Sequence, residues 1–260
     1  MTASTEVTYE FSAGVAVITL NRPASRNALT MPMVEQIIDG VRRAEREAAA
    51  LLIRAEGLAF CAGRDLADAR PGEEDGGRVL TEVFNPMVRA VADAQIPTVA
   101  AVQGAALGAG LGLALACDVI LAADTAKLGS PFASIGAVLD SGAHKAFVER
   151  LGQAVAMDLI YSGRFLSGVE AAAAGLVSRA LPADELDQAT RAYAAALATG
   201  PTLAFRESKR LVRELSQRPL TLAETLDREA QAQSRASRTK DYAEGFTAFL
   251  ERRPPHFRGE

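Results

Sequence analysis

Two glycine-containing segments are the part of this sequence best suited to chemistry. Residues 58–66 read Leu-Ala-Phe-Cys-Ala-Gly-Arg-Asp-Leu, and residues 104–112 read Gly-Ala-Ala-Leu-Gly-Ala-Gly-Leu-Gly. In each segment glycine follows a short apolar run, where a backbone can turn sharply and direct its N–H groups outward. Two such N–H groups meeting at one point would stabilise a carbonyl oxygen that becomes negative during a reaction.

Two other interpretations of these segments remain open at this point. Glycines after strands can serve tight turning alone. Gly108, Gly110 and Gly112 also lie between an expected strand and an expected helix, as in a dinucleotide phosphate loop. That fingerprint needs a further glycine at position 113, where this chain has Leu113. The spacing therefore disfavours a nicotinamide oxidoreductase.

Asp140 is the candidate acid–base residue. It follows the apolar residues Val138 and Leu139 and precedes a helical stretch at 141–151. Apolar neighbours would raise the pKa of its carboxyl group by desolvation, which suits a group that takes and returns a proton. The alternative is that Asp140 caps the N-terminus of that helix. His144, one helical turn later, either faces the same cavity or packs in the core or on the surface.

Composition argues against several other classes of function. The formal net charge of −4 disfavours generic binding to nucleic acid or to anionic membranes. Cys61 and Cys117 have no second Cys or His nearby, so we expect neither a disulfide framework nor a His/Cys metal site. No apolar run reaches the roughly 18 residues that cross a bilayer, and the first residues lack a signal-peptide pattern. A cytoplasmic protein is expected.

Alternating strand and helix patterns must position these groups. Thr30 is expected to cap a helix that has Pro32 in its first turn, and residues 167–170 fit a capping box. Residues 67–78 are rich in turn formers and predict a loop. Short apolar or β-branched runs predict strands at 15–20, 51–53, 99–102, 119–122 and 177–181. This rhythm predicts an α/β architecture with crossover helices.

The chain changes character after about Gly200. The strand signal disappears there, and helical stretches remain near 201–216, 221–237 and 239–252. We therefore expect an α/β core followed by a helical C-terminal part.

The two glycine segments, together with Leu-Asn-Arg-Pro at 20–23 and Arg-Arg-Pro-Pro-His-Phe at 252–257, resemble the enoyl-CoA hydratase/isomerase (crotonase) superfamily. The resemblance covers about residues 8–257. It implies a spiral of repeated ββα units with an acyl-CoA site over residues 1–199. It also implies a helical segment over 200–260 that assembles homotrimers or dimers of trimers and closes over CoA. The substrate would be an acyl-CoA thioester, and no separate cofactor is expected because coenzyme A is part of the substrate.

The resemblance also implies roles for individual residues. The oxyanion donors would be the main-chain N–H groups of Arg64 and Ala109. Independently of the resemblance, the net negative charge means that a polyanionic ligand must meet local basic groups such as Arg22, Arg26, Arg252 and Arg253, although a single arginine is more often a solvated surface charge. The implied CoA-binding residues are Arg26, Ala28, Ala62, Asp65, Leu66, Phe249 and Arg252, the last two often reaching CoA on a neighbouring subunit.

The acid–base positions distinguish the reactions of this superfamily. Family hydratases use two glutamates, and the matching positions here hold Gly112 and Phe132, which cannot transfer a proton. An Asp placed like Asp140 is similar to family isomerases, including epoxyphenylacetyl-CoA isomerases and some enoyl-CoA isomerases. Those isomerases often carry Pro-Asp-x-Gly-Gly-Thr, whereas residues 139–144 read Leu-Asp-Ser-Gly-Ala-His.

The sequence therefore favours double-bond isomerisation through a thioester enolate, with Asp140 as base and acid. The alternatives are an enoyl-CoA hydratase, as a family-level name would have it, and a protein that binds acyl-CoA without turning it over. The sequence does not determine the acyl chain, the pathway, or whether the assembly is a trimer or a hexamer.

Overall fold

A central six-stranded sheet organises the computed structural model, which describes residues 5–67, 69–70 and 72–260. All neighbouring strands run parallel except the first pair, which is antiparallel. In spatial order the strands are β1 (Val7–Ser12), β2 (Val15–Leu20), β3 (Ala50–Ala55), β4 (Thr98–Val102), β6 (Val119–Ala123) and β9 (Arg179–Leu181). A second sheet has the order β5 (Ala105–Leu107), β7 (Lys127–Gly129) and β8 (Leu166–Ser167).

Helices connect the strands and continue beyond the last one. A short 3₁₀ turn, η1 (Pro23–Ser25), follows β2, and a π-helical turn, η2 (Leu80–Phe84), joins α2 to α3. The α-helices are α1 (Met31–Glu47), α2 (Gly76–Val79), α3 (Asn85–Asp93), α4 (Ala109–Leu115), α5 (Phe132–Ile135), α6 (Ala143–Leu151), α7 (Gln153–Ser162), α8 (Gly168–Ala173), α9 (Leu186–Ala198), α10 (Thr202–Gln217), α11 (Leu222–Ala236) and α12 (Lys240–Glu251).

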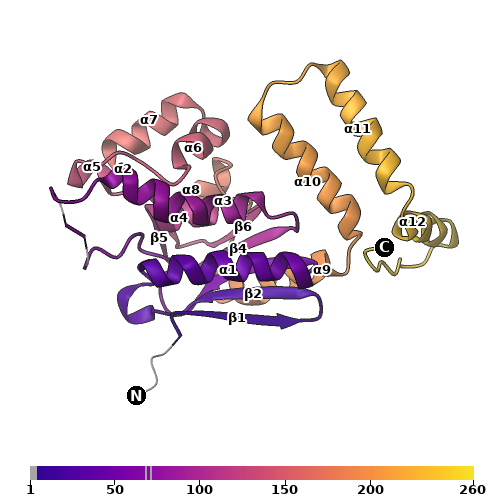
Figure 1. Ribbon diagram of the computed structural model, residues 1–260, viewed down its shortest axis with the longest axis horizontal. Coiled ribbons are helices and arrows are strands. Elements are labelled where there is room, and N and C mark those ends of the chain that lie inside the picture. The colour runs from indigo at the N-terminus through magenta and orange to yellow at the C-terminus, as the bar shows by residue number, and fades with distance from the viewer. Residues whose placement is uncertain (1–4, 68, 71) are drawn as a thin grey trace.

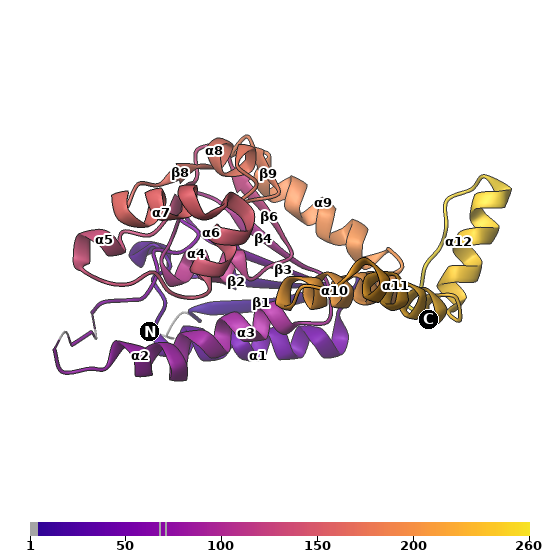
Figure 2. The ribbon, with the colours of Figure 1, turned by 90° about the horizontal axis from the view of Figure 1, so that it is seen from above.

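The central strands are apolar throughout because both faces of the sheet are covered. Along β2, Ile18 lies in the large core with Ile37 of α1, while Val17 on the opposite face lies in a smaller cluster with Ala194 of α9. Figure 2 shows α1 and α3 on one side of the sheet and α9 on the other. A strand buried on both faces reads as a continuous apolar run, which is why the sequence indicated it.

Local signals account for several helix ends. The Thr30 hydroxyl accepts a hydrogen bond from the Met33 N–H and begins α1, as expected. Ser167 and Glu170 form the predicted reciprocal capping box of α8. The expected loop at 67–78 ends earlier than its composition indicated, because Asp75 caps α2 and helix begins at Gly76. Residues 68 and 71 of that loop lie outside the described part of the chain.

The three C-terminal helices extend away from the sheet (Figure 1), and α12 lies at the end of the molecule opposite β5 and α5. On α12 the side chains of Phe246, Phe249 and Leu250 are 57%, 81% and 79% exposed. A face of large apolar side chains at this exposure is typical of a surface that another protein covers.

Candidate active site

The first glycine turn is held by a single parallel bridge between Leu29 and Arg64. The Leu29 N–H donates to the Gly63 carbonyl at 2.8 Å, and the Asp65 N–H donates to the Leu29 carbonyl at 2.9 Å. In such a bridge the N–H of the middle residue, Arg64, points away from the partner strand. Within the described residues this N–H has no acceptor.

The second glycine turn lies directly beside the first. The Cys61 N–H donates to the Ala105 carbonyl and the Leu107 N–H donates to the Cys61 carbonyl, both at 2.9 Å. Gly63 has φ +96°, and a Cβ placed on it would lie 2.9 Å from the Leu107 oxygen and 3.7 Å from the Ala109 nitrogen. The amide that follows Gly63 is therefore close to the amide of Ala109.

Ala109 is the first residue of α4, so its backbone is helical. Gly108 before it takes the unusual conformation, with φ +51° and ψ −125°. The strained backbone position in this turn is therefore held by glycine and not by alanine. The Ala109 N–H has no acceptor in the part of the chain that the structure describes. Two neighbouring amides thus have no acceptor within the described residues.

Ion pairs fix the side chains around the first turn. The Arg64 guanidinium binds both carboxylate oxygens of Glu74 at 2.8 Å, and this contact lowers the Glu74 pKa. Arg22 pairs with Glu6 at 3.0 Å and with Asp65 at 2.9 Å. The Asp65 pKa is lowered by the Ala67 N–H and by Arg22. These contacts hold the turn in place. The positive charge of Arg22 is balanced by carboxylates of the same chain.

The predicted CoA-binding residues near the turn form one continuous rim. Ala62 donates its N–H to the Arg26 carbonyl at 3.0 Å, and the Ala28 carbonyl accepts from Arg22 at 2.6 Å. The side chain of Arg26 is exposed, and Leu66 is 65% exposed. The structure therefore brings Arg26, Ala28, Ala62, Asp65 and Leu66 together beside Arg64, although it does not test their contact with CoA.

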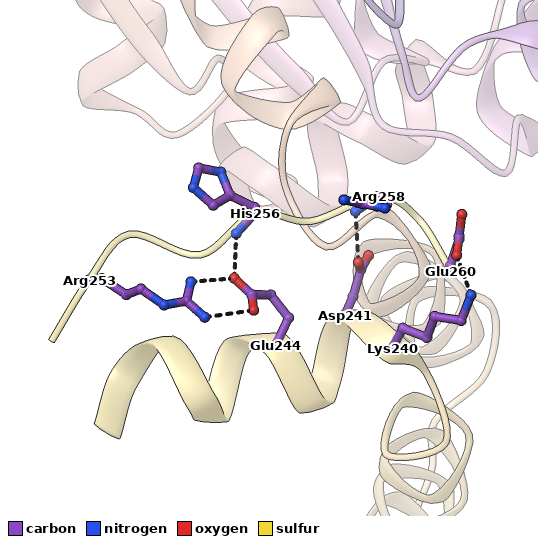
Figure 3. Close-up of a pocket in the computed structure, with 7 residues that line it drawn as sticks. All are labelled: Lys240, Asp241, Glu244, Arg253, His256, Arg258 and Glu260. Carbon is purple, nitrogen blue, oxygen red and sulfur yellow. Dashed lines mark hydrogen bonds and ion pairs between the residues drawn. The ribbon is translucent and has the colours of Figure 1, made fainter. Parts of the chain in front are cut away.

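Phe249 and Arg252 lie elsewhere, on α12 and at its end. The tail after α12 folds back onto that helix (Figure 3). Glu244 binds the Arg253 guanidinium through both oxygens, at 2.6 and 2.9 Å, and accepts the His256 N–H at 2.8 Å, which lowers the Glu244 pKa to about 2. Within one chain, this end of the molecule is remote from the glycine turns.

Asp140 does not cap the following helix. Helix α6 begins after Gly142, and no side chain caps it. The Asp140 Oδ1 atom is buried and has no hydrogen-bond partner among the described residues. Burial raises the Asp140 pKa, and nearby Ser141 and His144 oppose that shift in part. The capping interpretation is therefore wrong, and a carboxyl group suited to proton transfer remains. His144 itself is exposed.

Contacts with α4 place the Asp140 loop next to the second turn. A Cβ on Gly112 would lie 2.3 Å from the Ser141 Cβ and 2.5 Å from the Ser141 carbonyl oxygen. A Cβ on Gly108 would lie 3.2 Å from the Phe132 ring. Gly112 lies about 4.5 Å of axial rise beyond Ala109, so Ser141, the residue after Asp140, contacts α4 within one helical turn of the proposed donor. The absence of a side chain at 112 allows this approach.

No cluster of three or more His, Cys, Asp or Glu side chains suited to holding a metal occurs within the described ranges. No described helix combines the length and the apolar character needed to span a bilayer.

Known proteins share both the sequence and the architecture of this chain. The family model described as enoyl-CoA hydratase/isomerase matches residues 10–260. A "Probable enoyl-CoA hydratase" of Rhodobacter capsulatus is 39% identical over 253 residues, covering 97% of this chain and 98% of that protein. The chain belongs to the enoyl-CoA hydratase/isomerase family. The 1,2-epoxyphenylacetyl-CoA isomerase of Escherichia coli is 34% identical, covering 95% of this chain and 96% of that protein.

The fold agrees with this assignment to the enoyl-CoA hydratase/isomerase family. The crystal structure of an enoyl-CoA hydratase from Bacillus anthracis superposes with a TM-score of 0.92 at 29% identity, over 98% of this chain and 100% of that one. The predicted crotonase-type α/β fold with C-terminal helices is confirmed. Relatives named for hydration and for isomerisation both match, so family membership alone leaves the reaction open.

In this enoyl-CoA hydratase/isomerase family member, sequence reasoning missed three residues that shape the site. Glu74 holds Arg64, Cys61 accepts the Gly63 N–H through its Sγ atom at 3.4 Å, and Ser141 packs on Gly112. The acidic run at 73–75 indicated a solvated loop, and a lone cysteine or serine carries no local signal. Their roles depend on tertiary contacts.

Proposed function

We propose that this family member isomerises the double bond of an enoyl-CoA through a thioester enolate. The thioester oxygen accepts hydrogen bonds from the Arg64 and Ala109 N–H groups, which stabilise the negative charge that develops there. Asp140 removes a proton from the carbon next to the thioester and returns it two carbons away. One C–H bond breaks and one forms, and the double bond moves by one position.

The single observation that carries this proposal is the buried, unpartnered Oδ1 atom of Asp140, whose neighbour Ser141 packs against Gly112 of α4. One carboxyl group is enough for a proton shuttle, whereas hydration by the family's two-glutamate route needs two. By the resemblance, the glutamate positions hold Gly112 and Phe132. A longer side chain at 112 would collide with the Ser141 backbone, so this route has no space as well as no carboxylate.

The remaining assignments complete the proposal. Arg26, Ala28, Ala62, Asp65 and Leu66 contact CoA along the rim of the first turn. Phe249 and Arg252 contact CoA bound to a neighbouring subunit of a homotrimer or dimer of trimers, whose assembly through residues 200–260 would cover the apolar face of α12. Residues 1–199 form the core with the acyl-CoA site. The enzyme needs no separate cofactor and works in the cytoplasm.

The test offers 3-enoyl-CoA and 2-enoyl-CoA separately to the parent enzyme and to Asp140→Asn, in water labelled with oxygen-18. We expect the parent to move the double bond without incorporating the label. Asn at 140 should slow migration by about 10²–10⁴ while acyl-CoA affinity is kept. Asp39→Asn, which changes an exposed carboxylate on α1, is the matched control and should behave as the parent.

Two results would refute the proposal. Rapid label incorporation without migration would make the protein a hydratase, as the Rhodobacter capsulatus relative is named. Acyl-CoA binding that is equal in parent and Asp140→Asn, with no turnover of either substrate, would make it a binding protein.

A further inference from the structure

Ser141 has a backbone conformation that serine seldom adopts. Its φ is +54°, and its side chain is 4% exposed. Glycine adopts this left-handed region without steric cost, and the next residue, Gly142, has φ +82°. A buried non-glycine residue held there indicates that its side chain serves a purpose that offsets the strain.

The side chain of Ser141 occupies space next to helix α4. Its Cβ lies 2.3 Å from the point where a Cβ on Gly112 would stand. The Ser141 side chain and the Ser141 carbonyl oxygen, 2.5 Å from the same point, together exclude a side chain at position 112. In this chain the serine hydroxyl takes the place beside the Asp140 carboxyl.

Two adjacent buried oxygens lack partners. Ser141 Oγ and Asp140 Oδ1 each have no hydrogen bond with acceptable geometry within the residues that the structure describes. Buried polar atoms are nearly always paired, so an unpaired neighbouring donor and acceptor need an explanation. A hydroxyl can donate to a carboxylate, while an ionised carboxylate can only accept. The Ser141 hydroxyl acts on the Asp140 carboxyl closely enough to lower its pKa, so it is a candidate donor to that oxygen.

We infer that Ser141 is a positioning residue for Asp140: its hydroxyl donates to the carboxylate while Asp140 is the charged base and releases it once Asp140 carries the substrate proton. This inference rests on the proposed function, which makes Asp140 the base. It explains why the carboxylate can be charged in a buried place at all. The proximity of Ser141 already lowers the Asp140 pKa against the increase from burial.

Few other charges act on Asp140. His144 on α6 also lowers its pKa, helix α4 carries no titratable side chain, and α3 presents Val88 to Gly142. In Ser141→Ala and Ser141→Gly, the loss of the hydroxyl should therefore be the main cause of any change in the Asp140 pKa.

The test follows the Asp140 carboxyl signal by carbon-13 NMR against pH, with Asp140→Asn to assign it. In Ser141→Ala and Ser141→Gly we expect the titration to move up by about one pH unit. The acid limb of kcat/KM for 3-enoyl-CoA should move equally. The glycine variant should be thermally more stable than the alanine variant, because only glycine relieves the strain.

The paired variants separate the possible roles. A purely structural serine would leave both titrations at the parent pH and change only thermal stability, which would overturn this inference. If Asp140→Asn is inactive while both Ser141 variants keep the parent titration, the inference fails and the proposed function stands. If Asp140→Asn retains full turnover, the proposed function fails, and the carboxyl titration alone then decides whether Ser141 tunes Asp140.

Discussion

Proline at position 109 tests the oxyanion hole at a single atom. Ala109 is the first residue of α4, a position where proline fits because no intrahelical bond uses that N–H. The preceding residue is Gly108, which has no Cβ to clash with the proline ring. Ala109→Pro therefore removes one proposed donor, and the ring carbon bonded to nitrogen then occupies the site of the lost hydrogen.

The expected size of the effect follows from the contacts. Because the Ala109 N–H has no acceptor among the described residues, no internal hydrogen bond is lost, and the free energy of unfolding should stay within about 1 kcal/mol of the parent. Loss of one oxyanion donor costs about 2.7–4 kcal/mol in the transition state. The value of kcat/KM for 3-enoyl-CoA should therefore fall by at least about 10²–10³.

Two controls make the result interpretable. Ala109→Gly keeps the N–H and should retain turnover with a stability cost of about 1 kcal/mol. Leu222→Pro introduces proline at the equivalent first position of the exposed helix α11 and should leave turnover unchanged. Steady-state kinetics and thermal unfolding monitored by circular dichroism provide both readouts. A folded Ala109→Pro enzyme with parental kcat/KM would refute the assignment of this amide as a donor.

Three further predictions concern the loop that carries Asp140 and the first turn. Gly112→Ala requires a shift of about 1 Å in the Ser141 backbone and should lower kcat about 100-fold. The control is Gly76→Ala, where the added methyl group meets open space and kcat should stay at the parent value. Parental kinetics in both variants would contradict the contact between Gly112 and Ser141. Asp140→Asn should be more stable than the parent at neutral pH. The Asp140 pKa is raised on folding, so its protonation favours the folded state at low pH, and this contribution is lost as pH rises through the folded pKa. The stability difference measured by urea unfolding should shrink towards the unfolded pKa near pH 4, and a constant difference would contradict the shift. Burial raises the Cys61 pKa to about 12, so its thiol should react with a disulfide reagent only after unfolding, and rapid native labelling would contradict its buried position.

The parts of the fold that sequence could predict are those with strong local signals. The apolar run at 15–20 became β2, Thr30 began α1, and the helical pattern near 221–237 became α11. The edge strand β1 was missed because half of its residues are exposed, and β5, β7 and β8 are too short to show a period. Helix α9 was missed because its alanine-rich surface gives a weak apolar pattern.

The candidate site also has features that the sequence could predict and features that depend on tertiary structure. The two glycine turns were recognisable because positions such as Gly63 and Gly108 require a conformation that glycine adopts easily. The capping hypothesis for Asp140 failed because the chain inserts Ser141 and Gly142, both with positive φ, before the helix begins. Those two residues separate Asp140 from the helix end, and Ser141 packs against Gly112 of α4.

The contact between Gly112 and Ser141 shows why the choice of reaction is a tertiary property. A glycine at 112 reads locally as a weak helix residue, and a serine after an aspartate reads as a turn. Their close contact explains both choices: the glycine gives room for the loop, and the loop that follows Asp140 packs on the helix that carries the proposed donor. A larger residue at 112 would displace this loop even if it were itself an acid. Conversion of this site to a two-carboxylate hydratase should therefore require the 139–142 loop to be rebuilt together with position 112.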